Sequence, residues 1–397
     1  MAEIKPPKYV RQVLFTLQSR GYPAYLVGGC VRDMLLGQRP NDWDVCTGAL
    51  PEQVLSLFPG SRPTGAQHGT VTVVVGSRQV EVTTFRAEGA YSDHRHPDAV
   101  RFVADLTADL SRRDFTMNAI AVSADGLFAD PFGGVGDIRS GLIRCVGVPE
   151  QRFEEDALRM LRALRFSAKL GFSVDLITLE AIREKAPLAA TLAAERVRDE
   201  LEKTLLSGAP ETLFTMSELG LLDAYLDAPI PADAPLGALR QLPRRRGERW
   251  ACLGLILLRC GSAESLPRFL TRLKLDKRTV DACEDVARML AAPAPKEPRA
   301  WKRLLARYGV DAVSIAARCA DALDGGGHYR SLRQVLKSGE CFSLRHLAVT
   351  GDDLTALGLR GRDVGDTLRF LLDYVIDYPA NNQRELLLAL ADRSGEE

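Results

Sequence analysis

A glycine pair near the start of the chain constrains the fold more than any other feature of this sequence. Gly28 and Gly29 follow an apolar run at residues 25–27 that predicts a strand, and residues 31–36 predict a short helix after them. Glycines allow the backbone to approach a ligand closely, and the amides at the start of a helix can hold phosphate. The strand, turn and helix therefore predict a phosphate site, to which Arg32 adds a cation with a fork of donors.

Two carboxylates follow this predicted helix at a spacing of two residues. Asp42 and Asp44 point to the same face if they lie on a strand, because side chains alternate along a strand. Two carboxylates aimed at one point suit Mg²⁺, a hard cation that takes oxygen ligands and shares them with substrate phosphates. Glycine pairs and Asp-x-Asp are each common in turns and solvated loops. In this order, with Arg32 between them, they indicate a nucleotide and metal site.

A third acid lies in a predicted hairpin. Residues 71–75 and 79–85 are rich in β-branched side chains and are joined by a short turn that contains glycine, a pattern typical of a β-hairpin. The valines on either side of Glu81 share one face of their strand, so Glu81 points to the other face. Glu81 is therefore either a third acid beside the aspartates or a side chain on a solvated outer face.

Two arginine-rich segments come next. Residues 110–121 (LSRRDFTMNAIA) contain a serine, Ser111, that can cap a helix, followed by Arg113 and Asp114. On spacing alone this stretch is an ordinary capped helix with a charged first turn. Arginine also suits a triphosphate, and an aspartate can bind ribose hydroxyls.

The second segment, residues 151–170, predicts one long helix. Asp156, Arg159, Arg162 and Arg165 recur at every third residue, beside a row of leucines. At 3.6 residues per turn, this makes a polar ridge next to an apolar one. Ion pairing along the surface of a helix is the ordinary explanation and contributes only roughly 0.2–0.5 kcal/mol per pair. Three arginines to one acid is more positive charge than such pairing needs.

The composition limits the class of protein. At 397 residues, two or more domains are expected, and 46% hydrophobic with 26% charged residues is ordinary for a soluble globular protein. The formal net charge is zero, so any nucleic-acid site must be a local basic patch. Eight scattered cysteines without Cys-x-x-Cys argue against a zinc ribbon or a disulfide scaffold. We see no signal peptide or membrane-spanning run and expect a cytoplasmic protein without a membrane partner.

Strand patterns end near Pro149, and the remainder of the chain is predicted to be helical. Proline-rich segments at 229–235 and 293–298 are candidate domain joints. Residues 86–97 form a polar loop whose two histidines lack the spacing of metal ligands. Basic clusters that either meet RNA or are solvated lie at 244–246 and 274–278, and residues 351–362 predict a capped turn with basic residues.

The order GGxVRD…DxD, at residues 28–33 and 42–44, resembles the signature of the DNA-polymerase-β-like nucleotidyltransferases. Its form is similar to the class II tRNA nucleotidyltransferases, which comprise CCA-adding enzymes and bacterial poly(A) polymerases. Residues 112–119 (RRDFTMNA) and 130–138 (DPFGGVGDI) match further motifs of that family. The resemblance is strong over residues 22–205 and weak beyond them.

The resemblance implies an α+β fold. An N-terminal head with a small mixed β-sheet would be followed by all-α neck, body and tail domains. The implied boundaries are 1–147 for the head, 148–208 for the neck, 209–295 for the body and 296–397 for the tail. The body and tail would bind tRNA; the oligomeric state is left open.

The resemblance also implies phosphoryl transfer, in which the tRNA 3′-hydroxyl attacks the α-phosphorus of CTP or ATP and pyrophosphate leaves. Asp42 and Asp44 would hold Mg²⁺, with Glu81 as a candidate supporting acid. Asp156 and Arg159 would read the base, because cytosine and adenine offer an amine where uracil and guanine present a carbonyl. The residues that would contact phosphates or ribose are Gly28, Gly29, Arg32, Arg113, Asp114, Arg162 and Arg165.

Three alternatives remain open. A bacterial poly(A) polymerase shares the head, but residues 63–70 (PTGAQHGT) resemble the CCA-adding type and lack the arginine-rich stretch expected of such a polymerase. A specialised A-adding or CC-adding enzyme is the second. The loop at 86–97, which in the family goes with addition of A, speaks against CC-only addition, and nothing excludes A-only addition. The third is a tRNA-binding protein with an inactive head, against which the intact aspartates and arginines speak.

Overall fold

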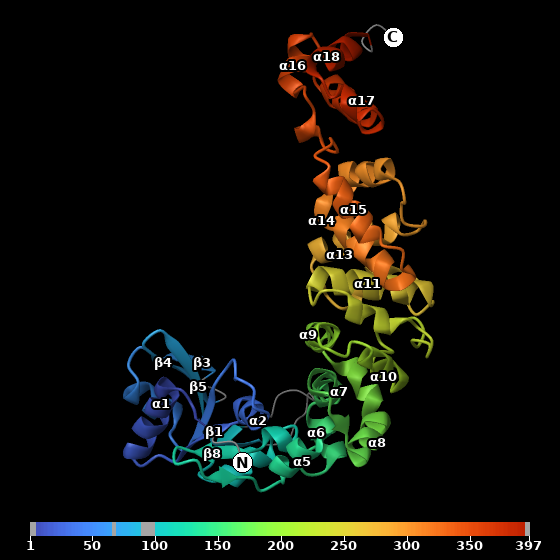
Figure 1. Cartoon of the computed structure of the whole chain (residues 1–397). Coiled ribbons are helices and arrows are strands. Elements are labelled where there is room, and N and C mark those ends of the chain that lie inside the picture. The colour runs from blue at the N-terminus through green and yellow to red at the C-terminus, as the bar shows by residue number, and fades with distance from the viewer. Residues whose placement is uncertain (1–4, 66–68, 89–99, 394–397) are drawn as a thin grey trace. The chain divides into compact units, whose positions relative to one another are not determined.

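The computed structural model describes residues 5–65, 69–88 and 100–393. By its contacts the chain divides into two compact units, Met1–Thr204 with Thr215–Ala224, and Leu205–Phe214 with Tyr225–Glu397. The first unit carries a β-sheet and helices, and the second is helical in its described residues (Figure 1). The predicted α+β fold, with its strands at the N-terminal end, is confirmed. Among the described residues, no helix is long and apolar enough to cross a membrane.

A mixed sheet forms the core of the first unit. Within the described residues it has seven strands in the order β3-β4-β5-β2-β1-β8-β9. Strands β2 and β5 pair in parallel, and the other neighbours pair antiparallel. The strands are β1 (Ala24–Val27), β2 (Asp44–Thr47), β3 (Arg62–Gly65), β4 (Thr70–Val75), β5 (Arg78–Thr84), β8 (Ala121–Ser123) and β9 (Phe128–Ala129).

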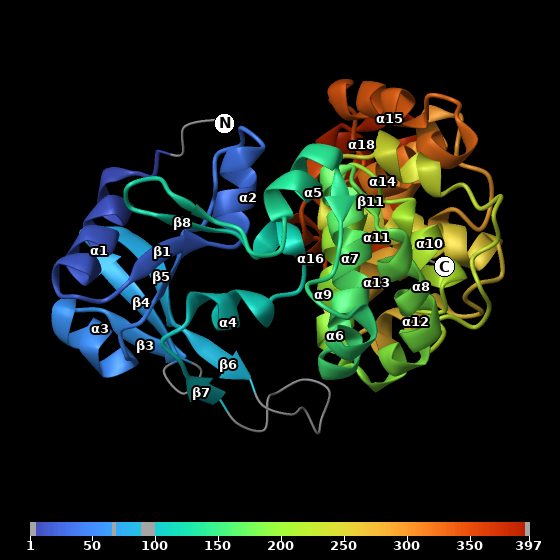
Figure 2. The same ribbon diagram turned by 90° about the horizontal axis from the view of Figure 1, so that it is seen from below.

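Local patterns explain the elements around this sheet. Helix α1 (Lys8–Ser19) buries four apolar side chains at the spacing of one helical face and lies beside α3 (Pro51–Leu57) against the sheet (Figure 2). The predicted hairpin is confirmed, since β4 and β5 pair with Val75 opposite Arg78. The predicted short helix after the glycines is α2 (Gly29–Leu35). A separate pair, β6 (Arg86–Glu88) and β7 (Val100–Phe102), follows β5.

The predicted long helix at 151–170 is two helices, α6 (Pro149–Glu155) and α7 (Leu158–Leu170). Asp156, between them, has an extended backbone with φ −145° and ψ 100°, and its side chain accepts the Leu158 N–H at 3.1 Å. An aspartate at a helix start satisfies amides that the helix itself leaves without partners. The prediction that strands end near Pro149 is wrong by one short strand, because β11 (Ser173–Val174) pairs in parallel with β10 (Leu142–Ile143).

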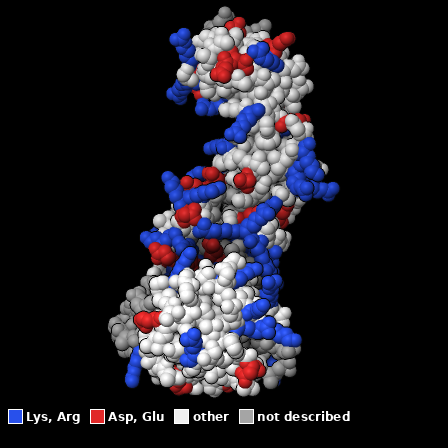
Figure 3. All heavy atoms as spheres, turned by 90° about the vertical axis from the view of Figure 1, so that its left-hand side faces the viewer, with Lys and Arg blue, Asp and Glu red and all other residues white. Residues whose placement is uncertain are grey.

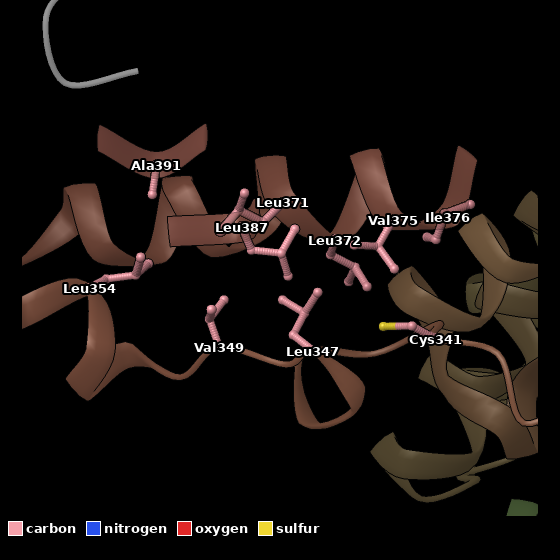
Figure 4. Close-up of a cluster of buried hydrophobic side chains, with 10 residues drawn as sticks. All are labelled: Cys341, Leu347, Val349, Leu354, Leu371, Leu372, Val375, Ile376, Leu387 and Ala391. Carbon is pink, nitrogen blue, oxygen red and sulfur yellow. The ribbon is translucent and has the colours of Figure 1, made fainter. Parts of the chain in front are cut away.

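The remaining helices pack through apolar faces. In the second unit α11, α13 and α14 contact one another, and Gly309 interrupts α14 with φ 78° and ψ 168°. The last three helices enclose their own apolar cluster, from Cys341 to Ala391 (Figure 4). The bounds of these and the other α-helices are α4 (Leu106–Ser111), α5 (Gly134–Ser140), α8 (Leu176–Lys185), α9 (Ala194–Leu205), α10 (Thr212–Glu218), α11 (Arg246–Arg259), α12 (Leu266–Arg272), α13 (Lys277–Met289), α14 (Pro298–Asp324), α15 (His328–Lys337), α16 (Gly351–Ala356), α17 (Arg362–Asp377) and α18 (Arg384–Arg393).

Candidate active site

Gly28 forms the turn between β1 and α2. Its φ of 77° lies in the region that favours glycine, because a Cβ is disfavoured there. A Cβ built on Gly28 would lie 3.1 Å from Nη1 of Arg113 and 3.6 Å from Oδ2 of Asp44. The absent side chain therefore leaves open the space between a cation and a carboxylate.

Three carboxylates lie close together around the start of β2. Asp44 begins β2 and is the Cα partner of Glu81 in β5, while Asp42 lies exposed just before β2. Burial and the charge of Glu81 raise the pKa of Asp44 to about 6, Asp42 adds to the rise, and Arg113 opposes it. Glu81 is exposed, so it lies beside Asp44 and also faces solvent. In the described part of the chain, no group of three or more His, Cys, Asp or Glu side chains is arranged to hold a metal ion by itself.

Arg113 is held from one side. Its Nη2 donates to Oδ2 of Asp109 at 3.3 Å, and Asp109 is fully buried in the first turn of α4. Arg112 donates from Nε and Nη2 to the other oxygen of Asp109, at 3.0 and 2.9 Å. The Nε of Arg113 is buried and has no hydrogen-bond partner among the described residues. Asp109 was missed by the sequence reasoning, although an acid three and four residues before two arginines is a recognisable helical pattern.

Arg32 is buried and fixed by two acceptors. Its Nη1 donates to Oδ1 of Asn118 at 2.7 Å, and its Nε and Nη2 donate to Oδ1 of Asp33 at 2.9 and 2.6 Å. A Cβ on Gly29 would lie 3.5 Å from Nη2 of Arg32, so the guanidinium lies against the glycine turn. The structure thus brings the two glycines, Arg32 and Arg113 together, as the sequence predicts.

Asp114 is enclosed by protein donors. Arg162 of α7 donates from Nε and Nη2 to Oδ2, at 2.9 and 2.5 Å, and Asn118 and the Phe115 N–H donate to Oδ1. Burial alone raises the pKa of Asp114, but the charge of Arg162 and these hydrogen bonds outweigh it and lower the pKa to about 2. Asp114 is therefore ionised at neutral pH and links the sheet-bearing segment to α7.

The sequence predicts more positive charge on the polar ridge of residues 156–165 than ion pairing needs. This prediction is wrong, because each arginine of the ridge is paired with an acid. Arg159 donates to Oε2 of Glu155 at 2.5 Å and to the Arg112 carbonyl at 3.0 Å. Arg165 forms an ion pair with Glu200 of α9. Together with the Arg162–Asp114 pair, each arginine of the ridge has an acidic partner from outside the ridge. Glu155 lies four positions before Arg159, within helical spacing, whereas the packing of separate segments supplies Asp114 and Glu200.

Asp156 and Arg159, which the sequence predicts to read the base together, have different partners in the structure. Asp156 receives Nη1 and Nη2 of Arg196, from α9, at 3.1 and 2.9 Å. Arg159 is engaged by Glu155, so neither residue's recorded bonds are to the other. Arg196 was not identified from the sequence, because forty positions separate it from Asp156.

An aromatic ring lies among the arginines. The guanidinium carbons of Arg165, Arg32 and Arg162 lie 3.9, 5.0 and 5.4 Å from the ring centroid of Phe166. A phenylalanine in an apolar helical stripe is indistinguishable in sequence from an ordinary core residue. The sequence reasoning accordingly missed it.

Two predicted segments are described only in part. Of residues 63–70 the structure describes 63–65 and 69–70, and of the loop at 86–97 it describes 86–88. The rest of both segments lies outside the described residues.

Three protein-family models match the chain. They are the "Poly A polymerase head domain" over residues 24–144, the "RNA and SrmB- binding site of polymerase A" over 171–231, and "tRNA nucleotidyltransferase domain 2" over 244–391. The first two descriptions refer to poly(A) polymerase, whereas the third names tRNA nucleotidyltransferase.

Relatives over nearly the whole length decide between these descriptions. The CCA-adding enzyme of Geobacillus stearothermophilus is 40% identical over 401 residues, which cover 97% of each chain. That of Lactiplantibacillus plantarum is 35% identical over 388 residues, covering 96% of this chain and 95% of the relative. The crystal structure of Bacillus stearothermophilus CCA-adding enzyme in complex with CTP matches with a TM-score of 0.84 and 35% identity, over 99% of this chain and 98% of that one. The chain therefore belongs to the CCA-adding enzymes, a family of class II tRNA nucleotidyltransferases.

Proposed function

We propose that the space between Asp44 and Arg113 is the catalytic site at which this chain adds C, C and A to the 3′ end of tRNA. The chain is a CCA tRNA nucleotidyltransferase, which uses CTP and ATP without a template and releases pyrophosphate. The observation that carries the assignment is at Gly28, where a Cβ would meet both groups, at 3.6 and 3.1 Å. A carboxylate suited to a metal and a cation suited to phosphate therefore flank one gap.

CCA-adding enzymes are nucleotidyltransferases that need a divalent metal ion, and we propose Mg²⁺, held by Asp42 and Asp44. The raised pKa of Asp44 supports this, because it reflects a buried carboxylate beside two further acids. Two carboxylates suffice for Mg²⁺, which completes its shell with water and phosphate oxygens. When bound, the ion would lower the pKa of the attacking hydroxyl and offset charge on the phosphates. Glu81 is proposed to add negative charge to the same site.

The triphosphate is proposed to lie against the glycine turn. Gly28 and Gly29 keep the space clear, and Nη1 of Arg113 lies 3.1 Å from the position that a Cβ on Gly28 would take. An arginine donor aimed at such a gap can bind a phosphate oxygen through a charge-assisted hydrogen bond. Arg32 borders the same turn, and Arg162 and Arg165 of α7, each paired with an acid, are proposed to lie toward the phosphates. Asp114 orients Arg162 and is proposed to lie near the ribose.

Asp156 and Arg159 are proposed to read the base. A carboxylate accepts from the exocyclic amine of cytosine or adenine, and an arginine donates to the neighbouring ring acceptor. For Asp156 the carboxylate can remain on Arg196 while it accepts from the base, because each oxygen has two lone pairs. Arg159 donates to Glu155 through Nη1. To read the base, it must therefore donate through an N–H that points toward the nucleotide instead of toward Glu155. Uracil and guanine would place a carbonyl against the carboxylate and be disfavoured.

Recognition of tRNA is proposed for the body and tail, residues 209–295 and 296–397. The net charge is zero, but Lys and Arg predominate among the charged side chains on the face drawn in Figure 3. Local cationic surface is what RNA backbone binding requires. The residues 1–147 would then catalyse transfer and 148–208 read the base, in a cytoplasmic enzyme. Exposed basic residues proposed for tRNA contact are Arg244, Arg245, Lys277, Arg278, Arg360 and Arg362.

Extension of a truncated tRNA tests this function. Purified protein with Mg²⁺, CTP and ATP is given a tRNA that lacks its last three nucleotides, and the products are sequenced. Ordered addition of C, C and A is expected. Long A tails on unrelated RNA would instead identify a poly(A) polymerase, and addition of A only to tRNA ending in CC would identify an A-adding specialist. Tight tRNA binding without incorporation would identify a binding protein.

A further inference from the structure

Phe166 gathers three guanidinium groups around one buried ring. Arg165 and Arg162 come from its own helix α7, whereas Arg32 comes from α2 beside the glycine turn. The residue is only 5% exposed, and Phe115 contacts its ring in a T-shaped arrangement, with centroids 5.8 Å apart. Cations from two separate segments thus share one aromatic residue.

The acids around this cluster do not explain it fully. Each arginine has a carboxylate partner, Asp33 for Arg32, Asp114 for Arg162 and Glu200 for Arg165. A carboxylate orients a guanidinium by taking up its N–H donors. An aromatic face attracts the same cation through its quadrupole without accepting an in-plane N–H. The ring therefore attracts the guanidiniums without itself taking up any of their N–H donors.

We propose that Phe166 is a positioning residue for triphosphate binding, which acts by holding Arg32 and Arg162 on the faces of its ring. This rests on the proposed function, in which these two arginines border the nucleotide's phosphates. Like charges repel one another, and the carboxylate partners offset part of this repulsion. Phe166 supplies a further negative potential within a buried volume, where cation–π attraction is strongest.

Fluorinated phenylalanines at position 166 test the proposal. Fluorine withdraws electron density from the ring and weakens its attraction for cations stepwise, with little change in shape. Affinities for CTP, CDP and CMP are measured by calorimetry for the mono-, di- and trifluorinated enzymes. We expect the Kd of CTP to rise at each step, by about 2- to 30-fold across the series. The Kd of CMP should change much less, and kcat at saturating CTP should stay near the wild-type value.

Phe153 provides a matched control. It lies fully buried in the adjacent helix α6, and no guanidinium is recorded over its ring within the described residues. Fluorination there should leave the Kd of CTP unchanged. If the fluorinated chains fold poorly, Phe166→Leu, which keeps an apolar side chain but has no quadrupole, is measured against the same three nucleotides.

The outcomes separate this proposal from the one on which it rests. An unchanged Kd of CTP across the series overturns the role of Phe166, as does equal weakening of CTP and CMP binding. Arg32→Gln and Arg162→Gln are compared in parallel. If both keep the wild-type ratio of CTP to CMP affinity, the phosphate assignment itself is wrong. If both lose it while fluorination has no effect, only the role of Phe166 fails.

Discussion

Arg196 holds both carboxylate oxygens of Asp156, with Nη1 3.1 Å from Oδ1 and Nη2 2.9 Å from Oδ2. Asp156 stands at the break between α6 and α7, where its Oδ1 also accepts the Leu158 N–H. The fork of donors fixes the plane of the carboxylate, and two lone pairs per oxygen leave room for one more donor. The residue proposed to read the base is therefore oriented by an arginine from α9.

Replacing Asp156 with alanine should reduce the choice of CTP over UTP. The variant loses the acceptor for the exocyclic amine, and a bidentate base contact is worth about 1–3 kcal/mol. Arg196→Gln should reduce the same preference less, because the carboxylate remains but is no longer held in one plane. The measurement is kcat/KM for CTP and for UTP on a tRNA that lacks its last three nucleotides.

Asp199 is the control for this prediction. It is an exposed acid of α9, the helix that carries Arg196, and it pairs with Arg198. Asp199→Ala should leave the preference unchanged. An Asp156→Ala enzyme with unaltered discrimination would show that Asp156 is an ordinary ion-pair residue.

Asp42→Ala and Asp44→Ala should each abolish nucleotide transfer while tRNA affinity and the unfolding temperature stay near wild type. Loss of a ligand to a catalytic metal removes the stabilisation of developing charge, and a rate loss of roughly 10³-fold or more is expected. Single-turnover incorporation of CMP at saturating Mg²⁺ measures the effect. Asp125→Ala, an exposed acid in the turn before β9, should behave as wild type. Near-normal turnover in either site variant would remove that residue from the metal site.

Binding of Mg²⁺ should weaken as the pH falls through the raised pKa of Asp44. Burial and Glu81 raise this pKa from 3.8 to about 6, so protons compete with the metal below that pH. The apparent affinity should fall up to about tenfold per pH unit below 6 and level off above it. Asp44→Asn should lose this dependence. An affinity that is flat from pH 5 to 8 in the wild type would contradict the assignment.

The same shift predicts how stability without metal depends on pH. Because the folded pKa is higher than the unfolded one, the native state binds more protons between pH 4 and about 6. The protonated Asp44 therefore stabilises the native state at low pH, and this stabilisation is lost as the pH rises through that range. Urea titrations in EDTA should find Asp44→Asn less sensitive to pH there than the wild type, and the reverse order would refute the raised pKa.

Gly28→Ala should inactivate the enzyme, whereas Gly37→Ala should only destabilise it. Both glycines have positive φ, 77° and 69°, so each alanine costs on the order of 1–3 kcal/mol of backbone strain. A Cβ at Gly28 would also meet Arg113 at 3.1 Å, while a Cβ at Gly37 meets nothing within 4 Å. Turnover is measured at a temperature where both variants are folded. Equal activity of the two would mean that the gap at Gly28 is not the nucleotide site.

Local patterns in the sequence were sufficient for the core of the head. The glycine turn, the hairpin and the alternation that exposes Glu81 follow from steric limits on short stretches of chain, and β1, α2, β4 and β5 form where predicted. The proximity of Asp44 to Glu81 was open in the sequence, because it depends on β2 and β5 being neighbours in the sheet. Strand order is set by packing across the whole head.

The ridge on α7 is where sequence reasoning was least informative. Residues 151–170 contain no proline or glycine to mark the break at Asp156, since an aspartate fits both a helical surface and a helix start. The acids that hold the arginines lie 35 and 48 positions away, at Glu200 and Asp114. Periodicity along one helix carries no information about such partners.

The sequence by itself determined which chemical groups the candidate site contains, because the glycines, aspartates and arginines follow one another in a recognisable local order. Only the tertiary structure decided how those groups are paired and oriented. Arg196 on Asp156, Arg162 on Asp114 and Arg32 beside Phe166 all arise where separate segments of the chain meet. Ion pairs and cation–π contacts act over a few ångströms of space, and a chain of α-helices brings residues that close through packing of its apolar faces.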